Sequence, residues 1–215
     1  DLNNYPLLRY FAKKNVPMIV STGLNELYEI DKAIKTIEEA GNKDIIILHC
    51  VSIYPPDNDQ VNLKRITTLQ QLYPDYPIGF SDHSIGSTLP IASIALGAAV
   101  IEKHFTFDKD MEGWDHAVSA DEKELIEICH GANKVYESMG TSRVKAVEDL
   151  TRRTEYKRSL TIVRDMKKGE KISATDLTAK RPASGLMPEM FEFVIGRTLS
   201  KDISSDSILN LDDLL

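Results

Sequence analysis

The chain has 215 residues, enough for one large or two small domains with a sizeable core. It carries 26 Lys and Arg against 33 Asp and Glu, a formal net charge of −7, and its lysines are scattered. This excludes a nucleic-acid-binding surface, which would show a basic patch. No apolar run approaches the roughly 20 residues that cross a bilayer, and no signal peptide is visible. We therefore expect a soluble, cytoplasmic protein without nucleic-acid or membrane partners, in which Cys50 and Cys129 are reduced and buried.

Four runs rich in Ile and Val are predicted as strands, each ending in polar residues. They are Pro17 to Ser21, Asp44 to His49, Pro77 to Ser81 and Ala99 to His104. Helices with apolar residues three or four positions apart fill the gaps. These helices run from Leu24 to Ile37, with Gly41 just beyond the end, and from Leu63 to Leu72. The apolar, small-residue stretch from Leu89 to Ala99 is long enough for one crossover helix. Because the strands are apolar on both faces, parallel pairing in an α/β domain is predicted.

After the fourth strand, Ser119 and Glu122 form a capping box in front of a helix that reaches Met139. The amino-acid composition and the apolar pattern of the chain change at about Gly140. Residues 141–157 are charged with little apolar periodicity, which predicts a linker. Residues 158–215 contain short strands and turns, which predicts a small domain of β and irregular structure. The predicted organisation is therefore 1–140, 141–157 and 158–215.

Histidines lie at the ends of the third and fourth predicted strands: His83 comes two residues after the third, and His104 is the last residue of the fourth. Neighbouring parallel strands end at the same edge of a sheet, about 5 Å apart. The two imidazoles can therefore converge on one metal ion and leave coordination positions open for substrate oxygens, as a Lewis-acid site requires. The alternative is a structural role for each histidine. His49 is predicted to pack behind the site, and His116 and His130 to lie on a loop and a helix surface.

Small hydroxyl donors occur at three strand ends, at Ser21, Ser52 and Ser81. Together with backbone N–H groups they suit an anionic ligand, although ordinary strand-end capping is the alternative for each. Lys103 can form a Schiff base in a lysine-dependent aldolase. Its place next to His104 on a strand, however, directs it to the opposite face, toward an acidic partner. Asp115 lies in a turn-prone loop and can bind sugar hydroxyls.

These segments, in this order and spacing, resemble the sialic acid synthase family, the N-acetylneuraminate and related nonulosonate synthases. The matching segments are Asn3–Leu7, Ser21–Gly23, Leu48–Cys50, Ile53–Pro55, Ser81–Ser84, Ile101–Thr106, Lys180–Pro182 and Ser184–Gly185. The resemblance implies the C-terminal half, strands 5 to 8, of a TIM (β/α)8 barrel, followed by a small β-rich SAF (antifreeze-like, β-clip) domain. It also implies the condensation of phosphoenolpyruvate with an N-acetylated sugar, such as N-acetylmannosamine, and the release of phosphate by C–O cleavage.

The resemblance further implies roles for individual residues. A divalent metal, Mn²⁺ or alternatively Mg²⁺ or Co²⁺, is expected on His83 and His104. The expected phosphoenolpyruvate-binding residues are Ser21, Ser52 and Ser81, and the expected sugar-binding residues are Asp1, Tyr54, Asp115 and Arg181. Asp115 is also expected to handle protons. Arg181 is expected to reach from the SAF domain of one subunit into the barrel of the other, in a domain-swapped homodimer.

The chain begins with Asp1, in what would be the middle of such a barrel. We therefore expect it to be the C-terminal part of a longer synthase, and to be inactive and prone to associate on its own, because a half barrel exposes strand edges and core. A legionaminate or pseudaminate synthase of the same family is one alternative function. A lysine-dependent aldolase acting through Lys103 and a non-catalytic saccharide-binding fragment are two others.

Overall fold

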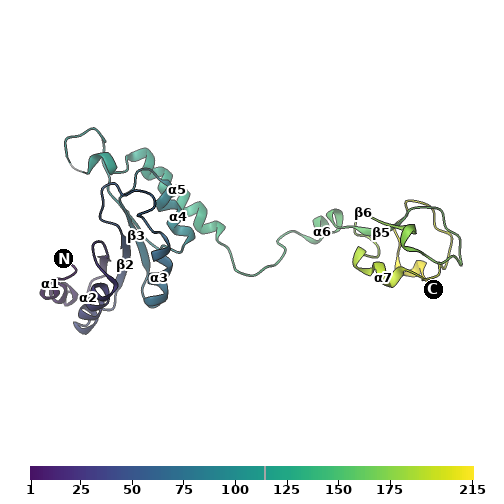
Figure 1. Cartoon of the computed structure of the whole chain (residues 1–215), viewed down its shortest axis with the longest axis horizontal. Helices are drawn as coiled ribbons and strands as arrows, with labels where there is room; N and C mark the ends of the chain where they lie inside the picture. The colour runs from purple at the N-terminus through teal and green to yellow at the C-terminus, as the bar shows by residue number, and fades with distance from the viewer. Residues whose placement is uncertain (114) are drawn as a thin grey trace. The chain divides into compact units, whose positions relative to one another are not determined.

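The computed structural model describes residues 1–113 and 115–215, and the chain forms two compact units, Asp1–Ser142 and Arg143–Leu215 (Figure 1). Each unit has a hydrophobic core of its own. In the part of the chain that is described, no helix has the length and apolarity needed to span a membrane.

The first unit is built on a parallel sheet whose strands lie in chain order. Its strands are β1 (Met18–Ser21), β2 (Ile45–Cys50), β3 (Ile78–Asp82) and β4 (Ile101–Lys103). The register pairs Ser21 with Leu48, Cys50 with Ser81, and Ser81 with Glu102. All four strands therefore end at one edge of the sheet. The predicted α/β class and parallel pairing are confirmed, and each strand begins and ends within two residues of its predicted bounds.

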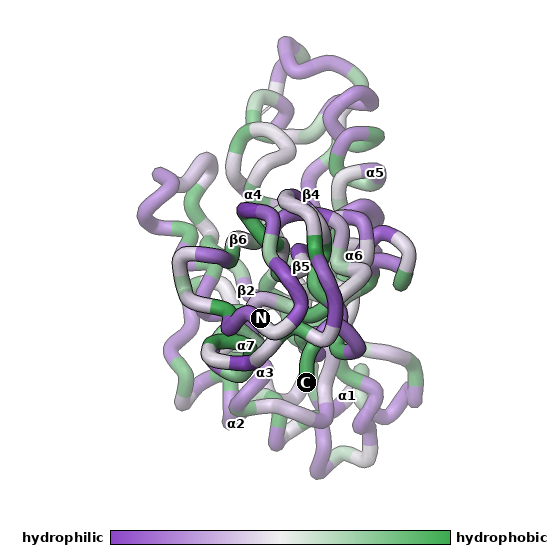
Figure 2. Tube along the Cα trace, turned by 90° about the vertical axis from the view of Figure 1, so that its right-hand side faces the viewer, coloured by the Kyte–Doolittle hydropathy of each residue, from purple (hydrophilic) through white to green (hydrophobic). Residues whose placement is uncertain are grey.

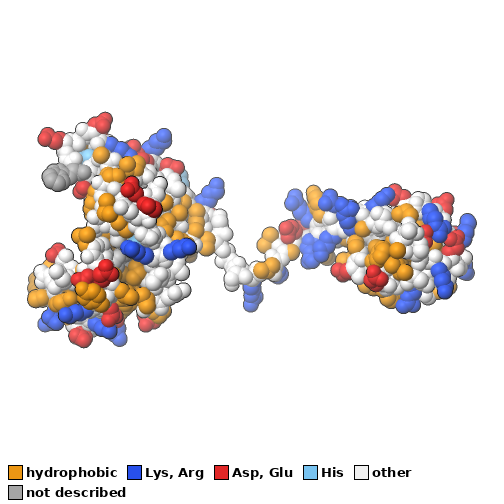
Figure 3. All heavy atoms as spheres, viewed as in Figure 1, with side chains coloured by type: hydrophobic (Ala, Val, Ile, Leu, Met, Phe, Trp, Pro, Cys, Tyr) orange, Lys and Arg blue, Asp and Glu red, His pale blue; other side chains and the backbone are white. Residues whose placement is uncertain are grey.

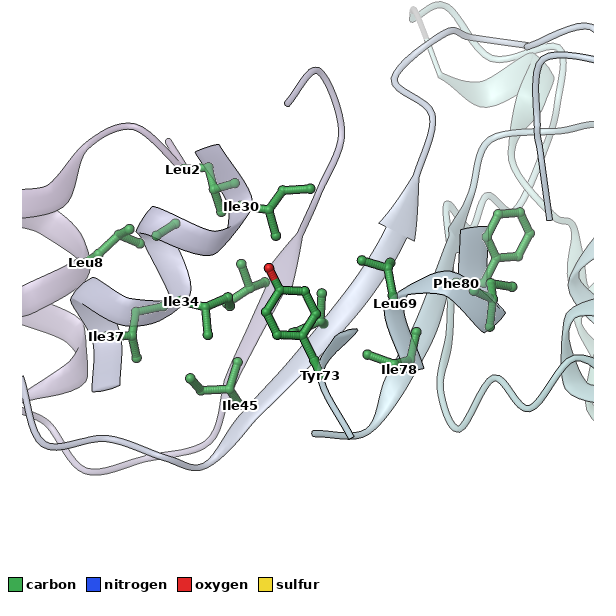
Figure 4. Close-up of a cluster of buried hydrophobic side chains, with 14 of the residues drawn as sticks. Leu2, Leu8, Ile30, Ile34, Ile37, Ile45, Leu69, Tyr73, Ile78 and Phe80 are labelled. Carbon is green, nitrogen blue, oxygen red and sulfur yellow. The ribbon is translucent and has the colours of Figure 1, made fainter. Parts of the chain in front are cut away.

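Helices connect the strands and cover one face of the sheet. They are α1 (Tyr5–Ala12), α2 (Leu27–Glu39), α3 (Lys64–Leu72), α4 (Thr88–Ala95) and α5 (Glu122–Ser138). Ile30, Ile34 and Ile37 of α2 point toward the sheet, and they share one hydrophobic core with Ile45 of β2 and Ile78 of β3 (Figure 4). Gly41 follows the end of α2 with φ +100°, the left-handed conformation that terminates a helix and that glycine adopts without strain.

The opposite face of the sheet is open. Ile19 of β1 points there and is 56% exposed, whereas its neighbour Val20 is buried beneath the helices. Apolar side chains are widely exposed on the first unit (Figure 3). Among the described residues β1 and β4 each have a strand neighbour on one side only. A curved sheet with one helix-covered face and one open face is what half of a βα barrel presents.

Two details of α5 differ from the prediction. Its cap is Asp121, whose carboxylate accepts a hydrogen bond from Glu124 N, and not Ser119. Ser119 instead belongs to the preceding 3₁₀ turn, where its hydroxyl bonds to Asp115 O. Cys129 is exposed, not buried, because only Ile128 of this helix is buried and the next residue lies about 100° around the helix. Hydrophobic and hydrophilic residues alternate along the helix (Figure 2).

The second unit opens with a helix that the sequence did not predict, because it has no apolar periodicity. This helix, α6 (Leu150–Tyr156), lies within the predicted linker and has no buried residue. Its start is fixed locally, since Asp149 accepts a hydrogen bond from Arg152 N. The remaining elements are the antiparallel strands β5 (Ser159–Ile162) and β6 (Leu177–Lys180) and the short helix α7 (Phe191–Val194). The predicted small β-rich domain is confirmed.

Asp176 is a buried carboxylate at the turn before β6. It accepts hydrogen bonds from the Ser173 hydroxyl (2.7 Å), the Ser173 amide (2.9 Å) and Arg164 Nε (2.6 Å). These contacts, led by the Ser173 hydroxyl and Arg164, lower the pKa of Asp176 to about 2. The carboxylate therefore stabilises the folded unit fully above its unfolded pKa of about 4, and this contribution disappears as the pH falls toward 2.

We predict that Asp176→Asn lowers the stability of the second unit by about 0.5–2 kcal/mol at pH 6, the range for loss of a capping residue. The difference from the unsubstituted protein should shrink between pH 4 and pH 2. Chemical unfolding followed at several pH values measures both effects. Asp206→Asn is the control: Asp206 forms an exposed ion pair with Lys180, and its loss should cost less than about 0.5 kcal/mol. A pH-independent deficit in Asp176→Asn would contradict this account.

Candidate active site at the strand ends

His83 and His104 follow β3 and β4 directly, and the register of these strands brings the two side chains together. Asp82 pairs with Lys103, so the next residue on each strand occupies an equivalent position at the sheet edge. Both imidazoles lie on the open face, and their ring centroids are 5.1 Å apart. The convergence predicted from the sequence is therefore present.

The orientation of the His83 ring is fixed by its surroundings. Nδ1 lies 3.0 Å from the carbonyl oxygen of Val51 and 3.9 Å from Cys50 Sγ, and the Tyr54 ring packs against it at 4.2 Å. Burial lowers the pKa of His83, but the contacts with Cys50 and the Val51 carbonyl outweigh it and raise the pKa. When Nδ1 donates to the carbonyl, the lone pair of Nε2 remains free.

The His104 ring is more open. Its side chain is 35% exposed, and Nδ1 lies 3.7 Å from Asp115 Oδ2. Tyr54 also reaches this ring, with centroids 5.8 Å apart in an edge-on arrangement. One tyrosine thus contacts both histidines, and Asp115 approaches from the loop after β4.

The donor set suits a borderline divalent ion. A histidine that binds a metal usually donates its other ring N–H to a carbonyl or carboxylate, and His83 has such a partner in Val51 O. Within residues 1–113 and 115–215 no group of three or more His, Cys, Asp or Glu is arranged to hold an ion. Two imidazoles therefore form an incomplete ligand set, one that leaves positions for substrate or water oxygens.

Cys50 lies at the centre of the three predicted anion-binding serines. Its sulfur is 3.7 Å from Ser52 Oγ, and Ser81 is its register partner on β3. Burial raises the pKa of the Cys50 thiol, but hydrogen bonds with His83 and the three serines outweigh burial and lower the pKa to about 7. The Ser81 hydroxyl itself donates to Glu102 Oε1 at 2.7 Å. The three serines thus face one small polar region beside the histidines.

Gly23 allows the ends of β1 and β2 to approach each other. A Cβ atom at this position would lie 2.2 Å from Ser52 Oγ and 3.0 Å from Cys50 Sγ. Any larger residue would displace the side chains that define the polar region. Close packing against Ser52 and Cys50 therefore explains why the segment Ser21–Gly23 ends in glycine.

Lys103 lies on the other face, as its alternation with His104 predicted. Its ammonium group contacts Asp82 Oδ2 at 2.6 Å, and its side chain is only 3% exposed. An amine held in this ion pair cannot reach a substrate on the open face, which argues against the aldolase alternative. His49 is buried as predicted, with Nε2 2.7 Å from Val61 O. His116 lies in the turn after β4, bonded to Thr106, and His130 is on the exposed surface of α5.

Asp1 and Arg181 each have local partners within their own unit. Asp1 is exposed in the turn before α1, where its carbonyl accepts a hydrogen bond from Asn4 N. Arg181 belongs to the second unit, where Nε donates to Tyr156 O and the guanidinium packs over the Tyr156 ring. Their predicted sugar-binding roles remain predictions.

Sequence reasoning missed Cys50 and Glu102 as members of the site. The sequence predicts only that Cys50 is reduced and buried, and it predicts no role for Glu102. The signal was strand alternation: Cys50 and Glu102 are register partners of Ser81 on its two neighbours, and so share its face.

Comparison with known proteins identifies the two units. The NeuB family matches residues 1–144, and the SAF domain matches residues 157–215. The chain belongs to the NeuB family. The resemblance found in the sequence is thereby confirmed, and with it the fold class, a half barrel of βα units followed by a SAF domain.

Relatives extend this identification. An uncharacterised protein of Methanocaldococcus jannaschii is 41% identical over all of this chain and 64% of its own length. The N,N'-diacetyllegionaminic acid synthase of Legionella pneumophila is 36% identical over 97% of this chain and 60% of its own length. The solved structure of N-acetylneuraminic acid synthetase from Leptospira borgpetersenii is 35% identical, with a TM-score of 0.64 over 68% of this chain and 50% of that one. The chain thus spans about three fifths of the length of the two curated relatives.

We predict that Cys50 reacts with iodoacetamide at a rate that rises with pH around a midpoint near 7, since the thiolate is the nucleophile. The measurement uses a Cys129→Ser background after chelation of metal, so that Cys50 is the one cysteine left among these 215 residues, and the labelled site is identified by peptide mapping. Ser52→Ala in that background should shift the midpoint upward, because one hydrogen bond that lowers the pKa is lost. A midpoint of 8.5 or above in the parent would contradict the described surroundings of the thiol.

Proposed function

We propose that the protein to which this chain belongs is a nonulosonic acid synthase that condenses phosphoenolpyruvate with an N-acetylated sugar and releases phosphate. The single observation that carries the proposal is the histidine pair, 5.1 Å apart at the ends of β3 and β4 in a NeuB-family half barrel. A packing role does not require two imidazoles on an open polar face beside three serines and an aspartate.

The residues take their proposed roles from this arrangement. Ser21, Ser52 and Ser81 would hold the anionic oxygens of phosphoenolpyruvate, in the polar region centred on Cys50. The C2–C3 π electrons of phosphoenolpyruvate form a bond from C3 to the aldehyde carbon of the open-chain sugar, whose oxygen takes up a proton, and C2 becomes cationic. Water then adds to C2 and loses a proton. Phosphate leaves with the bridging oxygen by C–O cleavage, and loss of the second proton completes the C2 carbonyl.

Tyr54 and Asp115 flank the histidines and would bind sugar hydroxyls. Asp115, near His104, is also placed to accept or return a proton. Asp1 and Arg181 are proposed to hold the far end of the sugar. For Arg181 this would require the SAF domain of a partner subunit in a domain-swapped homodimer.

His83 and His104 would hold a divalent ion, with Mn²⁺ as the first candidate and Mg²⁺ or Co²⁺ as alternatives. When bound, such an ion supplies Lewis acidity toward a carbonyl oxygen. The free Nε2 of His83 supports this assignment, because Nδ1 already has a carbonyl partner.

The acceptor sugar defines the product. N-acetylmannosamine would yield sialic acid, and 2,4-diacetamido sugars would yield legionaminic or pseudaminic acid. The similarity to a legionaminic acid synthase over 97% of the chain supports including the second class.

We predict that the protein expressed from its complete gene releases phosphate from phosphoenolpyruvate in the presence of Mn²⁺ and one of these sugars. His83→Ala and His104→Ala should each reduce the rate by more than about 100-fold, since loss of a group that merely orients a metal ligand already costs 10–100-fold. Phosphate release with each sugar in turn is the measurement.

His130→Ala serves as the control, because His130 is exposed on α5 in the same unit. Its rate should match that of the unsubstituted protein. Absence of release with every sugar, or metal-dependent release that survives in both active-site variants, would overturn the proposal. Sugar binding without turnover, unaffected by either substitution, would favour a saccharide-binding role instead.

A further inference from the structure

The residues directly before the two histidines form a buried ion pair. Lys103 Nζ lies 2.6 Å from Asp82 Oδ2, with side-chain exposures of 3% and 0%. Asp82 and Lys103 are also direct register partners of β3 and β4. An ion pair therefore joins the last residues of β3 and β4, and the next residue in each case is a histidine.

Further hydrogen bonds enclose His83 on both sides. Lys103 Nζ donates to the carbonyl oxygen of Ser84 at 2.5 Å, and Ser84 N donates to Asp82 Oδ1 at 2.9 Å. The lysine thus binds the residue before His83 and the residue after it. Its own neighbour in the chain is His104.

The pair lies away from the open face. Lys103 borders a cavity between β4 and the helices, together with Ile94 of α4 and Leu125 and Ile128 of α5. His104, the next residue, points to the opposite face by strand alternation. Neither charge of the pair can therefore contact a substrate bound beside the histidines.

Stability alone does not account for such a pair. Removing two charges from water costs about as much as their attraction returns, and apolar residues of similar volume often stabilise a fold equally well or better. What an ion pair provides, and an apolar pair does not, is a fixed separation and direction between two strands.

We propose that the Asp82–Lys103 ion pair is a positioning element that sets the spacing and orientation of His83 and His104 for a shared divalent ion. This inference rests on the proposed function in one respect, namely that the two histidines bind a metal. Asp82 and Lys103 act through the histidines and do not touch the ion or the substrates.

The test compares Mn²⁺ affinity with folding stability in the complete protein. Lys103→Met should weaken Mn²⁺ binding by about 10- to 100-fold in calorimetric titration, the usual effect of losing a partner that orients a ligand. It also leaves Asp82 buried without its partner, so the thermal midpoint should fall.

The double variant Asp82→Leu with Lys103→Met separates the two effects. Apolar replacement of both partners should restore the thermal midpoint, because no unpaired charge remains. Mn²⁺ affinity should remain weak, and the visible spectrum of the Co²⁺-loaded protein should differ from that of the unsubstituted protein. A merely structural pair predicts that affinity and spectrum recover together with stability, which would overturn the proposal.

Asn42→Ala is the matched control, because it removes a buried polar link at the amino ends of the strands. Asn42 Nδ2 donates to Val16 O at 2.9 Å, and Asp44 N donates to Asn42 Oδ1 at 2.8 Å. This variant should lose thermal stability and keep its Mn²⁺ affinity.

Titration of His83→Ala distinguishes failure of this proposal from failure of the proposed function. If the unsubstituted protein binds Mn²⁺ no better than His83→Ala, the metal site itself is wrong and both proposals fall. If Mn²⁺ binding depends on His83 but is unchanged in Lys103→Met, only the positioning role is overturned.

Discussion

The site depends on the register between β3 and β4. Parallel pairing of Ser81 with Glu102 and of Asp82 with Lys103 determines where the two following histidines stand. A shift of either strand by one residue would turn its histidine to the helix-covered face, because side chains alternate along a strand. The buried ion pair between Asp82 and Lys103 provides a physical reason for this register to be fixed.

The two faces of the sheet have different roles: one packs into the hydrophobic core, and the other carries the candidate binding residues. On the helix-covered face, Ile34, Ile45 and Phe80 belong to one apolar core. On the open face, the strand ends carry the serines, Cys50 and the histidines, with Tyr54 packed over both imidazoles. Successive side chains of a strand point to opposite faces. The same strands therefore supply apolar residues to the rigid core and polar residues to the candidate site. Placement on strand ends gives the candidate ligands fixed backbone positions, as a metal site requires.

Much of this fold was predictable from the sequence, since apolar runs and helical spacing give strong local signals. The strands and α2, α3 and α5 arise from such runs, and the histidine pair follows from where two of them end. What could not be predicted depends on contacts between distant segments or on purely local caps. The role of Cys50 needs Ser21, Ser81 and His83 from other strands. The helix α6 depends on the Asp149 cap and has no apolar face, so periodicity could not reveal it. The acidic partner of Lys103 was expected, but its identity as Asp82 required the register.

The most direct test of the account is a count of the imidazoles bound to the ion. X-ray absorption at the cobalt edge of the Co²⁺-loaded complete protein reports this number from the outer-shell scattering of the rings. The account predicts two imidazole ligands in the unsubstituted protein and one in His104→Ala, with oxygen ligands completing the coordination. A spectrum with no imidazole contribution, or one that His104→Ala leaves unchanged, would contradict the claim that the ends of β3 and β4 form a shared metal site.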